Sequence, residues 1–511
     1  MRRALCVATA LATATVWLAA PASASNAYGP KVDDRVAAAA GSIAKTDLLN
    51  VVVGGSAPDR AVAALKGTIV TTLSATAVAA QIQAQNLSKL AGDARVSSIS
   101  PDLPAMPAAT SFDWAPAIDY AAVDAAPEAW AKGLDGNGVG VAVIDSGVSP
   151  SVDFGTRLVQ VVRKSQRLNT TTDLYGHGSF VAGVVGGKNA LGRYAGIAPG
   201  ATIYSLKVAE DGAGARTGDI IDAINWAASD ACHGCNIRVI VIAASETNPT
   251  SYEGSLLDAA VEHAWRNNIV VVVAAGNLGA SATFFAPAND PFAIAVGALD
   301  DAGHVADWST NGTTPDGYAR PDLLAPGRHI VSLLPVGTTL YNQAPSTNVD
   351  PAGYGMANGS SYAAPQVAGA AAILLQQNPS LTPDQVKWIL TTTGRPIAGS
   401  SVPALDIKAA IAQHPSIGFA NGGVPIGNCV DQTPGGPCFS GGASYLNQFD
   451  WTKAAAANGR ALSAASAYNA TATANTSTTW NTSATWNTSA TWNTSATWNT
   501  SATWNTSATW N

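Results

Sequence analysis

Charged residues are scarce in this chain of 511 residues. Asp, Glu, Lys and Arg make up only 12% of it, and the formal net charge is −7. The sequence has no long run of Lys and Arg, which argues against a nucleic-acid partner and against adhesion to anionic membranes. The hydrophobic content of 47% is sufficient for a large core, and the length predicts two or more folded units.

Cysteine is also rare, with five residues in the chain. Cys6 lies in an N-terminal apolar stretch, which leaves Cys232, Cys235, Cys429 and Cys438. In an oxidising compartment these four cysteines predict two disulfides with three possible connectivities, and we favour the two sequence-local pairs. Cys232 and Cys235 also resemble half of a redox or zinc motif, but a structural zinc site needs a second pair of ligands.

Long apolar runs are missing after the N-terminus, so no later segment is predicted to span a membrane. The chain begins with two arginines, continues with an apolar segment and reaches the small-residue triplet Ala22-Ser23-Ala24. This layout predicts a signal peptide at 1–24 and a secreted protein. The alternative, an uncleaved membrane anchor, is disfavoured because the stretch is short and weakly hydrophobic.

A small unit of alternating patterns precedes the main part of the chain, and we predict an α+β domain at 25–110. Strands are predicted at 48–55, 68–74 and 94–100, and helices at 58–67 and 75–93. The stretch 100–111, rich in Pro and Ala, is interpreted as an exposed linker that a protease can cut.

The region 111–415 alternates strongly apolar strands with helices, which predicts a parallel sheet covered by helices on both faces. Buried strands are predicted at 139–144, 238–244 and 269–275. Helices are predicted at 178–187, 218–230, 254–267, 361–377 and 383–393.

The C-terminal part has a different composition. Residues 416–474 form a predicted linker rich in Gly, Pro and Ala, and residues 475–511 form a tail in which NTSATW occurs five times from Asn481. A six-residue period with one Trp per unit suits a β-solenoid or stacked extended chains, and a disordered tail is the equal alternative. Because Trp rings stack on sugars, we expect the tail to contact a cell wall or polysaccharide and to retain the protein at the cell surface.

Three residues at the ends of predicted elements can form a nucleophilic site. Asp145 ends a buried strand, and His177 and Ser361 each begin a helix. Functional groups gather at the carboxyl ends of parallel strands and the amino ends of helices, so all three are expected to face one crevice. Each alone also fits a turn or a helix cap. Together they provide a nucleophile, a base and an acid that orients the base.

The residues around these positions resemble the subtilisin-like serine peptidases, the subtilases. VAVIDSGV, HGSFVAG and GSSYAAPQVAG resemble the Asp, His and Ser motifs of that family in its order, and VVVVAAGN resembles the strand that delivers the oxyanion-hole asparagine, here Asn277. The resemblance implies a subtilisin-like α/β fold and a serine endopeptidase with catalytic Asp145, His177 and Ser361. It also implies an acyl-enzyme intermediate, protein or peptide substrates, a monomer and no cofactor for the chemistry.

The resemblance extends to the substrate cleft. Ala243, Ala244 and Ser245 stand where the strand of the family that pairs with substrate ends. Phe285 falls near the floor of the specificity pocket, where the family usually has a small residue, and predicts a preference for small side chains before the cut bond. Beside the nucleophile, Tyr362 replaces the usual methionine.

Two further features follow from the resemblance. Asp153 matches an aspartate that binds calcium in the family, but Ala190 stands where a side-chain oxygen is expected, so calcium is expected at most as a stabilising ion. The unit at 25–110 resembles the family's inhibitory propeptide, a ferredoxin-like domain. It is expected to cap the cleft as the chain's own partner and to be cut off near residues 103–112.

Two other functions are weaker alternatives. An adhesion protein that only carries this fold is disfavoured by the intact triad. An α/β-hydrolase esterase is disfavoured because GSSYA lacks the second glycine of G-x-S-x-G, and because that fold places its acid and histidine after the serine.

Overall fold

The structure is a computed structural model, and it describes a large part of the chain. The described residues are 27–107, 117–163, 168, 170–191, 194–209, 214–229, 234–247, 249–280, 282–412, 414 and 416–427. The predicted signal peptide at 1–24, most of the linker at 416–474 and the repeat tail at 475–511 lie outside these residues, so those predictions stay predictions.

The N-terminal unit contains a four-stranded antiparallel sheet in the order β2-β3-β1-β4. Its elements are α1 (Asp34–Ser42), β1 (Leu48–Gly55), α2 (Pro58–Ala64), β2 (Thr68–Ser74), β3 (Ala77–Gln83), η1 (Ala84–Asn86), α3 (Leu87–Ala91) and β4 (Val96–Pro101). From β1 to β4 the chain order is βαββαβ, the ferredoxin-like arrangement. The unit has its own hydrophobic core, in which Leu49, Val53 and Leu87 are fully buried.

The helix predicted at 75–93 is wrong for its first half, which forms β3. Alanine and glutamine favour helices in isolation, but here two neighbouring strands, β1 and β2, bond to both edges of the segment. Its alternation places Val78, Ala80 and Ile82 in the core of the unit, while Ala77 and Ala79 belong to the core of the larger unit. Tertiary packing therefore overrides the local propensity.

A seven-stranded parallel sheet forms the centre of the larger unit, in the order β16-β13-β12-β10-β6-β8-β7. These strands are β6 (Gly140–Asp145), β7 (Leu158–Gln160), β8 (Thr202–Lys207), β10 (Ile237–Ile242), β12 (Val270–Ala274), β13 (Ile294–Leu299) and β16 (Leu323–Pro326). The central strands are buried along their whole length, which explains their nearly continuous apolar sequences. The three predicted strands correspond to β6, β10 and β12.

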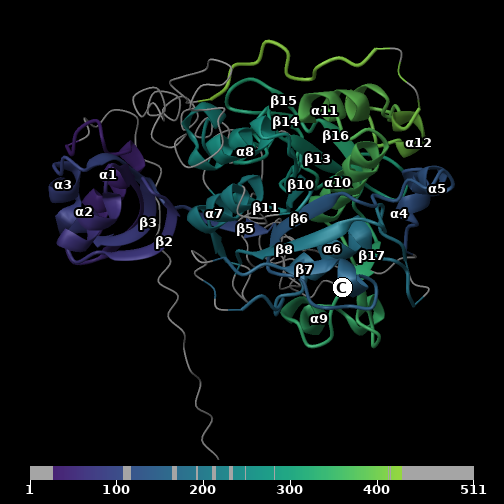
Figure 1. Cartoon of the computed structure of the whole chain (residues 1–511), viewed down its shortest axis with the longest axis horizontal. Coiled ribbons are helices and arrows are strands. Elements are labelled where there is room, and N and C mark those ends of the chain that lie inside the picture. The colour runs from purple at the N-terminus through teal and green to yellow at the C-terminus, as the bar shows by residue number, and fades with distance from the viewer. Residues whose placement is uncertain are drawn as a thin grey trace, which may run out of the picture.

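Helices cover both faces of this sheet, as predicted. The helices α6 (His177–Gly186) and α10 (Ser360–Gln377) pack together on one face, and α7 (Thr217–Ala228) and α8 (Leu256–Arg266) pack together on the other (Figure 1). The predicted helix at 383–393 is α11 (Pro383–Thr392), which begins with a capping box between Thr382 and Gln385. The predicted parallel α/β fold is confirmed.

The other elements lie around this core. They are α4 (Tyr120–Val123), α5 (Ala126–Trp130), η2 (Gly155–Arg157), η3 (Tyr252–Gly254), β14 (Gly312–Thr313), β15 (Ala319–Arg320), β17 (Ile330–Leu333), α9 (Thr339–Gln343), η4 (Ser346–Asn348), β18 (Val349–Asp350), β19 (Tyr354–Ala357) and α12 (Ile407–Ala410).

The segment after β4 does not form an exposed linker. Strand β5 (Pro104–Pro107) lies between β9 (Ala215–Arg216) and β11 (Ala244–Glu246) and runs antiparallel to both. Leu103 and Ala105 are buried, because the segment fills the gap between two strands of the larger unit. The prediction of an exposed connection is therefore wrong for residues 100–105, and residues 108–111 lie outside the described part of the chain.

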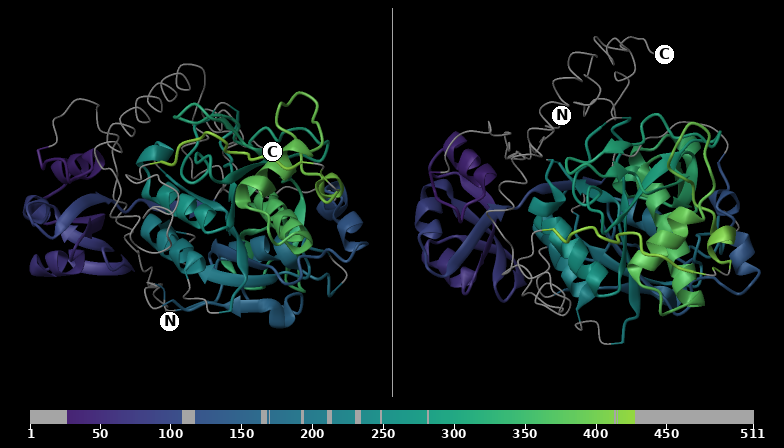
Figure 2. Two further views of the ribbon diagram at one scale, coloured as in Figure 1. Left: turned by 45° about the horizontal axis from the view of Figure 1, so that its top comes forward. Right: turned by 90° about the horizontal axis from the view of Figure 1, so that it is seen from above.

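The two units are also joined through helix α7, beside which the N-terminal unit lies in all three views (Figures 1 and 2). The carboxylate of Asp102 accepts a hydrogen bond from the Gly218 N–H at 2.9 Å, and the backbone N–H of Thr217 donates to the Leu103 carbonyl at 2.9 Å. The carboxylate thus satisfies a free N–H in the first turn of α7, where a negative charge also complements the helix dipole.

The larger unit continues past the predicted boundary at residue 415. Ile426 is buried, and the Gly427 N–H donates to Glu262 at 2.8 Å. Cys235 is bonded in a disulfide, and its predicted partner Cys232 lies outside the described residues, as do Cys429 and Cys438, so the pairing stays a prediction. None of the helices in the described part of the chain combines the length and apolar character needed to cross a bilayer.

Candidate active site

Two of the predicted site residues are in direct contact. Asp145 is the last residue of β6 and His177 the first of α6, and both side chains are buried. Nδ1 of His177 lies 2.9 Å from Oδ1 and 3.0 Å from Oδ2 of Asp145. Because an ionised carboxylate only accepts hydrogen bonds, Nδ1 carries the proton in this contact and Nε2 is the proton acceptor. The imidazole therefore has the tautomer that a general base needs.

A second aspartate, Asp173, fixes the start of α6. It accepts hydrogen bonds from the backbone N–H groups of Gly176 and Ser179 at 2.7 and 2.8 Å, and from the Ser146 hydroxyl at 2.9 Å. Burial raises the pKa of Asp173, while these hydrogen bonds act in the opposite direction. The sequence analysis missed this residue, although an aspartate shortly before a helix is a capping signal.

Gly178 allows α6 to approach β6 closely. A Cβ atom at this position would lie 2.1 Å from the Gly147 carbonyl oxygen and 3.1 Å from Cβ of Asp145. The absence of a side chain at Gly178 thus brings the beginning of α6, with His177, against the end of the strand that carries Asp145.

Ser361 is the second residue of α10 and is fully buried. Its hydroxyl lies 3.4 Å from the Ala243 carbonyl oxygen. The ring of the next residue, Tyr362, lies 5.7 Å from the His177 ring between centroids, so Ser361 borders the same site. No described residue forms a hydrogen bond to Nε2 of His177. Nucleophile–base contacts often shorten only when substrate is bound.

Asn277 connects the end of β12 to the beginning of α10. Its Oδ1 accepts a hydrogen bond from the Ser360 N–H at 3.0 Å, and the Ser360 hydroxyl accepts one from the Gly276 N–H at 3.1 Å. Nδ2 of Asn277 lies beside Gly359, where a Cβ atom would be 3.5 Å away. A side-chain amide and the first N–H groups of an 18-residue helix thus lie next to Ser361, which is the composition of an oxyanion-binding site.

The predicted substrate-pairing residues lie beside Ser361. Ala244 and Ser245 belong to β11 and pair with Pro107 and Met106 of β5. Ala243, which precedes β11, provides the carbonyl oxygen near the Ser361 hydroxyl. An extended chain is therefore already paired with the strand that was predicted to bind substrate.

Phe285 lies next to this strand. It is half-buried and precedes the cis peptide bond between Ala286 and Pro287. The Ala286 carbonyl accepts a hydrogen bond from the Glu246 N–H at 2.8 Å, which joins the segment to β11. The segment that contains Phe285 is thus joined to the predicted substrate-pairing strand, and the role of Phe285 in specificity stays a prediction.

The surroundings of Asp153 do not fit a calcium ion bound directly to its carboxylate. Asp153 is fully buried, and its oxygens accept hydrogen bonds from the Ala190 N–H at 2.6 Å and from the Tyr354 hydroxyl at 3.0 Å. These donors occupy the carboxylate where calcium would require a shell of oxygen ligands. The described residues contain no group of three or more His, Cys, Asp and Glu suited to hold a metal. These hydrogen bonds argue against direct binding of calcium by Asp153, and calcium as a stabilising ion stays a prediction.

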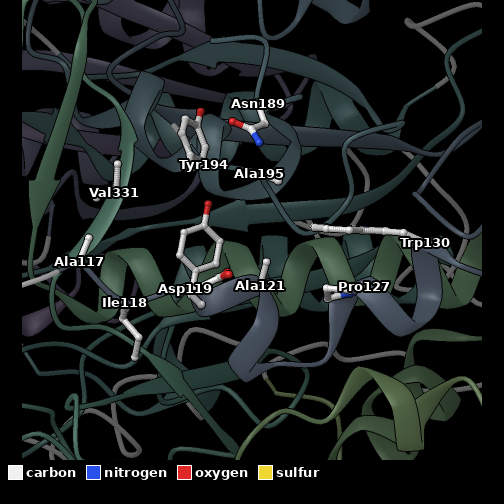
Figure 3. A pocket seen from close by; sticks show the side chains of 11 residues that line it. Ala117, Ile118, Asp119, Ala121, Pro127, Trp130, Asn189, Tyr194, Ala195 and Val331 are labelled. Carbon is white, nitrogen blue, oxygen red and sulfur yellow. The ribbon is translucent and has the colours of Figure 1, made fainter. Parts of the chain in front are cut away.

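A separate pocket of about 360 Å³ is formed by α4, α5 and the segment after α6 (Figure 3). Tyr120, Trp130, Asn189 and Tyr194 are among its lining residues. None of its lining residues belongs to the predicted site, so we assign it no part in the chemistry.

Residues 136–422 match the model of the Subtilase family of peptidases, Peptidase_S8, which is more than half of the chain. The chain belongs to the subtilase family. Serine protease AprX of Bacillus subtilis is 35% identical over 271 residues, 50% of this chain and 61% of that protein. Subtilisin BL of Lederbergia lenta is 34% identical over 278 residues, 54% of this chain and 91% of that protein.

The fold agrees with this assignment. The crystal structure of fervidolysin from Fervidobacterium pennivorans, a keratinolytic enzyme related to subtilisin, aligns with a TM-score of 0.58 at 23% identity and covers 72% of this chain and 61% of that one. At this identity the likeness concerns the fold alone. The predictions of a subtilisin-like fold and of a subtilisin-like serine endopeptidase are confirmed at the level of the family.

Proposed function

We propose that this subtilase is a secreted endopeptidase that hydrolyses peptide bonds through Ser361, His177 and Asp145 and is made as a self-processed precursor. The observation that carries the proposal is the contact between His177 and Asp145 at 2.9 and 3.0 Å, next to the amino end of the helix that bears Ser361. This contact sets the tautomer of the base beside a serine at a helix N-terminus.

In the proposed mechanism the Ser361 hydroxyl attacks the peptide carbonyl while Nε2 of His177 accepts its proton. Asp145 orients the imidazole and stabilises the imidazolium that forms. The tetrahedral oxyanion accepts hydrogen bonds from Nδ2 of Asn277 and the Ser361 N–H, with support from the dipole of α10. His177 returns the proton to the leaving amine. Water then attacks the acyl carbonyl while Nε2 of His177 accepts a water proton, the bond to Ser361 breaks, and His177 returns this proton to the Ser361 oxygen.

The N-terminal unit is proposed to act as an inhibitory propeptide. Strand β5 pairs with β9 and β11 and leads toward Ser361, as a product would. Pro107, the last residue of β5, is opposite Ala244, and the carbonyl of the neighbouring Ala243 lies 3.4 Å from the Ser361 hydroxyl. We therefore place the processed bond within the few residues after Pro107, inside the predicted range 103–112.

The side-chain preference is proposed to favour small residues immediately before the cut bond. The support is the large side chain of Phe285, which stands where the family usually has a small residue, in a segment bonded to β11 through the Glu246 N–H. Initial rates on peptides that differ only between Ala and Phe at this position test the idea, and faster cleavage of the Phe peptide would contradict it.

Export and surface retention rest on the sequence. The segment 1–24 supports secretion, and the repeated Trp residues at 475–511 support retention on a cell wall or polysaccharide. A form truncated after residue 427 should be secreted but lose binding to the insoluble material. Equal binding by both forms would remove the basis of this role.

The central test compares the secreted wild type with Ser361→Ala, each incubated with casein. We expect wild type to lose its first ~110 residues and to degrade casein, and the variant to do neither, because loss of a triad member lowers kcat by roughly 10⁴-fold or more. Mass spectrometry of the secreted chain identifies the bond that has been cut. If both proteins stay full length and casein survives, the proposed activity is wrong.

A further inference from the structure

An aromatic ring fills the space between the two helices that carry Ser361 and His177. Tyr362 follows Ser361 in α10 and is fully buried. Its ring centroid lies 5.7 Å from that of the His177 imidazole and 4.2 Å from that of Phe180. His177 and Phe180 are three residues apart in α6 and so lie on one face of it. One ring of α10 therefore contacts both residues of that face.

The same ring reaches the turn that precedes the nucleophile. A Cβ atom at Gly359 would lie 3.5 Å from Cδ2 and Cε2 of Tyr362, and equally far from Nδ2 of Asn277. Tyr362 thus borders the proposed oxyanion donor as well as the base. Tyr175 is a second aromatic neighbour of the imidazole, with centroids 6.4 Å apart.

We propose that Tyr362 is a positioning residue that holds the His177 imidazole in the orientation required for proton transfer and stabilises the imidazolium through its π electrons. The inference rests on the proposed function, because it requires His177 to be the base. It assigns to the aromatic residue a role that sequence comparison alone does not, since methionine is usual at this position in the family.

The physical argument has two parts. The contact with Asp145 fixes one edge of the imidazole, and a second, rigid contact further restricts rotation of the ring plane. A buried aromatic ring provides it, whereas a methionine has three rotatable bonds. A cation over the face of an aromatic ring, within about 6 Å of its centroid, is attracted electrostatically, and the attraction is stronger where water is excluded. The centroids of the Tyr362 and His177 rings are 5.7 Å apart, which is within this distance, and the rings are tilted by 43°.

The test compares Tyr362→Leu, Tyr362→Phe and Phe180→Leu with wild type. Rates on a peptide substrate are measured from pH 5 to 10, and a sulfonyl fluoride that labels Ser361 counts the competent sites. We expect Tyr362→Leu to lower kcat at least ~10-fold with KM within about twofold, because misplaced reacting groups reduce the rate of chemistry. We also expect a shift in the acid limb, the low-pH side of the profile on which kcat/KM rises as His177 loses its proton. This limb should move to lower pH by about half a unit, because the imidazolium loses the attraction of the ring.

The other two variants separate this role from simple packing. Tyr362→Phe keeps the ring and should keep kcat within about threefold and the acid limb unchanged. Phe180→Leu removes a ring that contacts Tyr362 at 4.2 Å, so it should lower thermal stability without moving the acid limb. If Tyr362→Leu does not fold, Tyr362→Met replaces it in the same comparison.

Two results overturn the inference. One is a Tyr362→Leu or Tyr362→Met variant with the kcat and acid limb of wild type, and the other is an equal shift of the acid limb in Phe180→Leu. Failure of the proposed function is distinguishable, because wild type itself would then neither hydrolyse the peptide nor react at Ser361 with the sulfonyl fluoride.

Discussion

Replacing Glu246 with glutamine should abolish most of the pH dependence of the affinity between the N-terminal unit and the larger unit. Glu246 is buried beneath β5, pairs with Ala105 and accepts a hydrogen bond from the Thr217 hydroxyl at 3.0 Å. Burial raises the pKa of Glu246 to about 7; Arg35 and Thr217 oppose this effect, while Asp102 and Asp33 add to it.

The size of this pH effect follows from the linkage between proton binding by Glu246 and association of the two units. When the N-terminal unit leaves, β5 leaves with it, Glu246 is exposed and its pKa returns toward 4.5. A raised pKa means that the complex binds the proton more tightly than the separated units do, so the contact is strongest below pH 4.5 and weakens as the pH rises to 7. With these two values the affinity should fall roughly 70-fold between pH 5 and pH 8, or roughly 2.5 kcal/mol.

The assay is isothermal titration of the N-terminal unit, residues 27–107, against the larger unit carrying Ser361→Ala, at pH 5, 6, 7 and 8. Glu246→Gln should flatten most of the change seen in wild type. The matched control is Glu128→Gln, a carboxylate of the larger unit that is exposed and pairs with Lys408 at 3.3 Å. If wild type and Glu246→Gln lose affinity equally as the pH rises, the reasoning is refuted.

Three further predictions concern stability and are measured by thermal unfolding in the Ser361→Ala background, which prevents self-digestion. Gly178→Ala should cost about 3 kcal/mol, because its Cβ would lie 2.1 Å from the Gly147 carbonyl; an unchanged Tm would refute the close contact. Burial raises the pKa of Asp290 from 3.8 to about 7, so the native state loses stability relative to the unfolded chain as the pH rises from about 4 to 7. Asp290→Asn should therefore raise the Tm more at pH 9 than at pH 5, and equal effects at both pH values would contradict this sign. Tyr354→Phe removes a hydrogen-bond donor to the buried carboxylate of Asp153 and should lower the free energy of unfolding by about 1–2 kcal/mol. Addition of a chelator should shift the Tm of the parent protein by less than about 1 °C. A large chelator effect would argue for a cation at this site.

The sequence predicted the central sheet well because its strands are buried on both faces and read as continuous apolar runs. The contact between Asp145 and His177 was expected for a related reason, since the ends of parallel strands and the starts of their helices meet at one edge of the sheet. The alternation of strands and helices along the chain places the end of β6 and the beginning of α6 at the same edge of the sheet, and with them these two residues.

The errors arose where contacts between distant segments decide the structure. The alanine-rich β3 has a helical propensity, and only its pairing with β1 and β2 makes it a strand. The segment of β5 has the composition of a linker, yet two strands from a distant part of the chain bury it.

The three-stranded arrangement of β9, β5 and β11 has a consequence for the choice of target proteins. If the N-terminal unit is removed as proposed, β9 and β11 present two open hydrogen-bonding edges, which suit the main chain of an extended segment about as long as the four residues of β5. Segments held in helices or sheets cannot offer such a main chain until they open. The vulnerability of a target protein to this protease is therefore set by the local unfolding free energy of its loops and termini, more than by the amino acids found there.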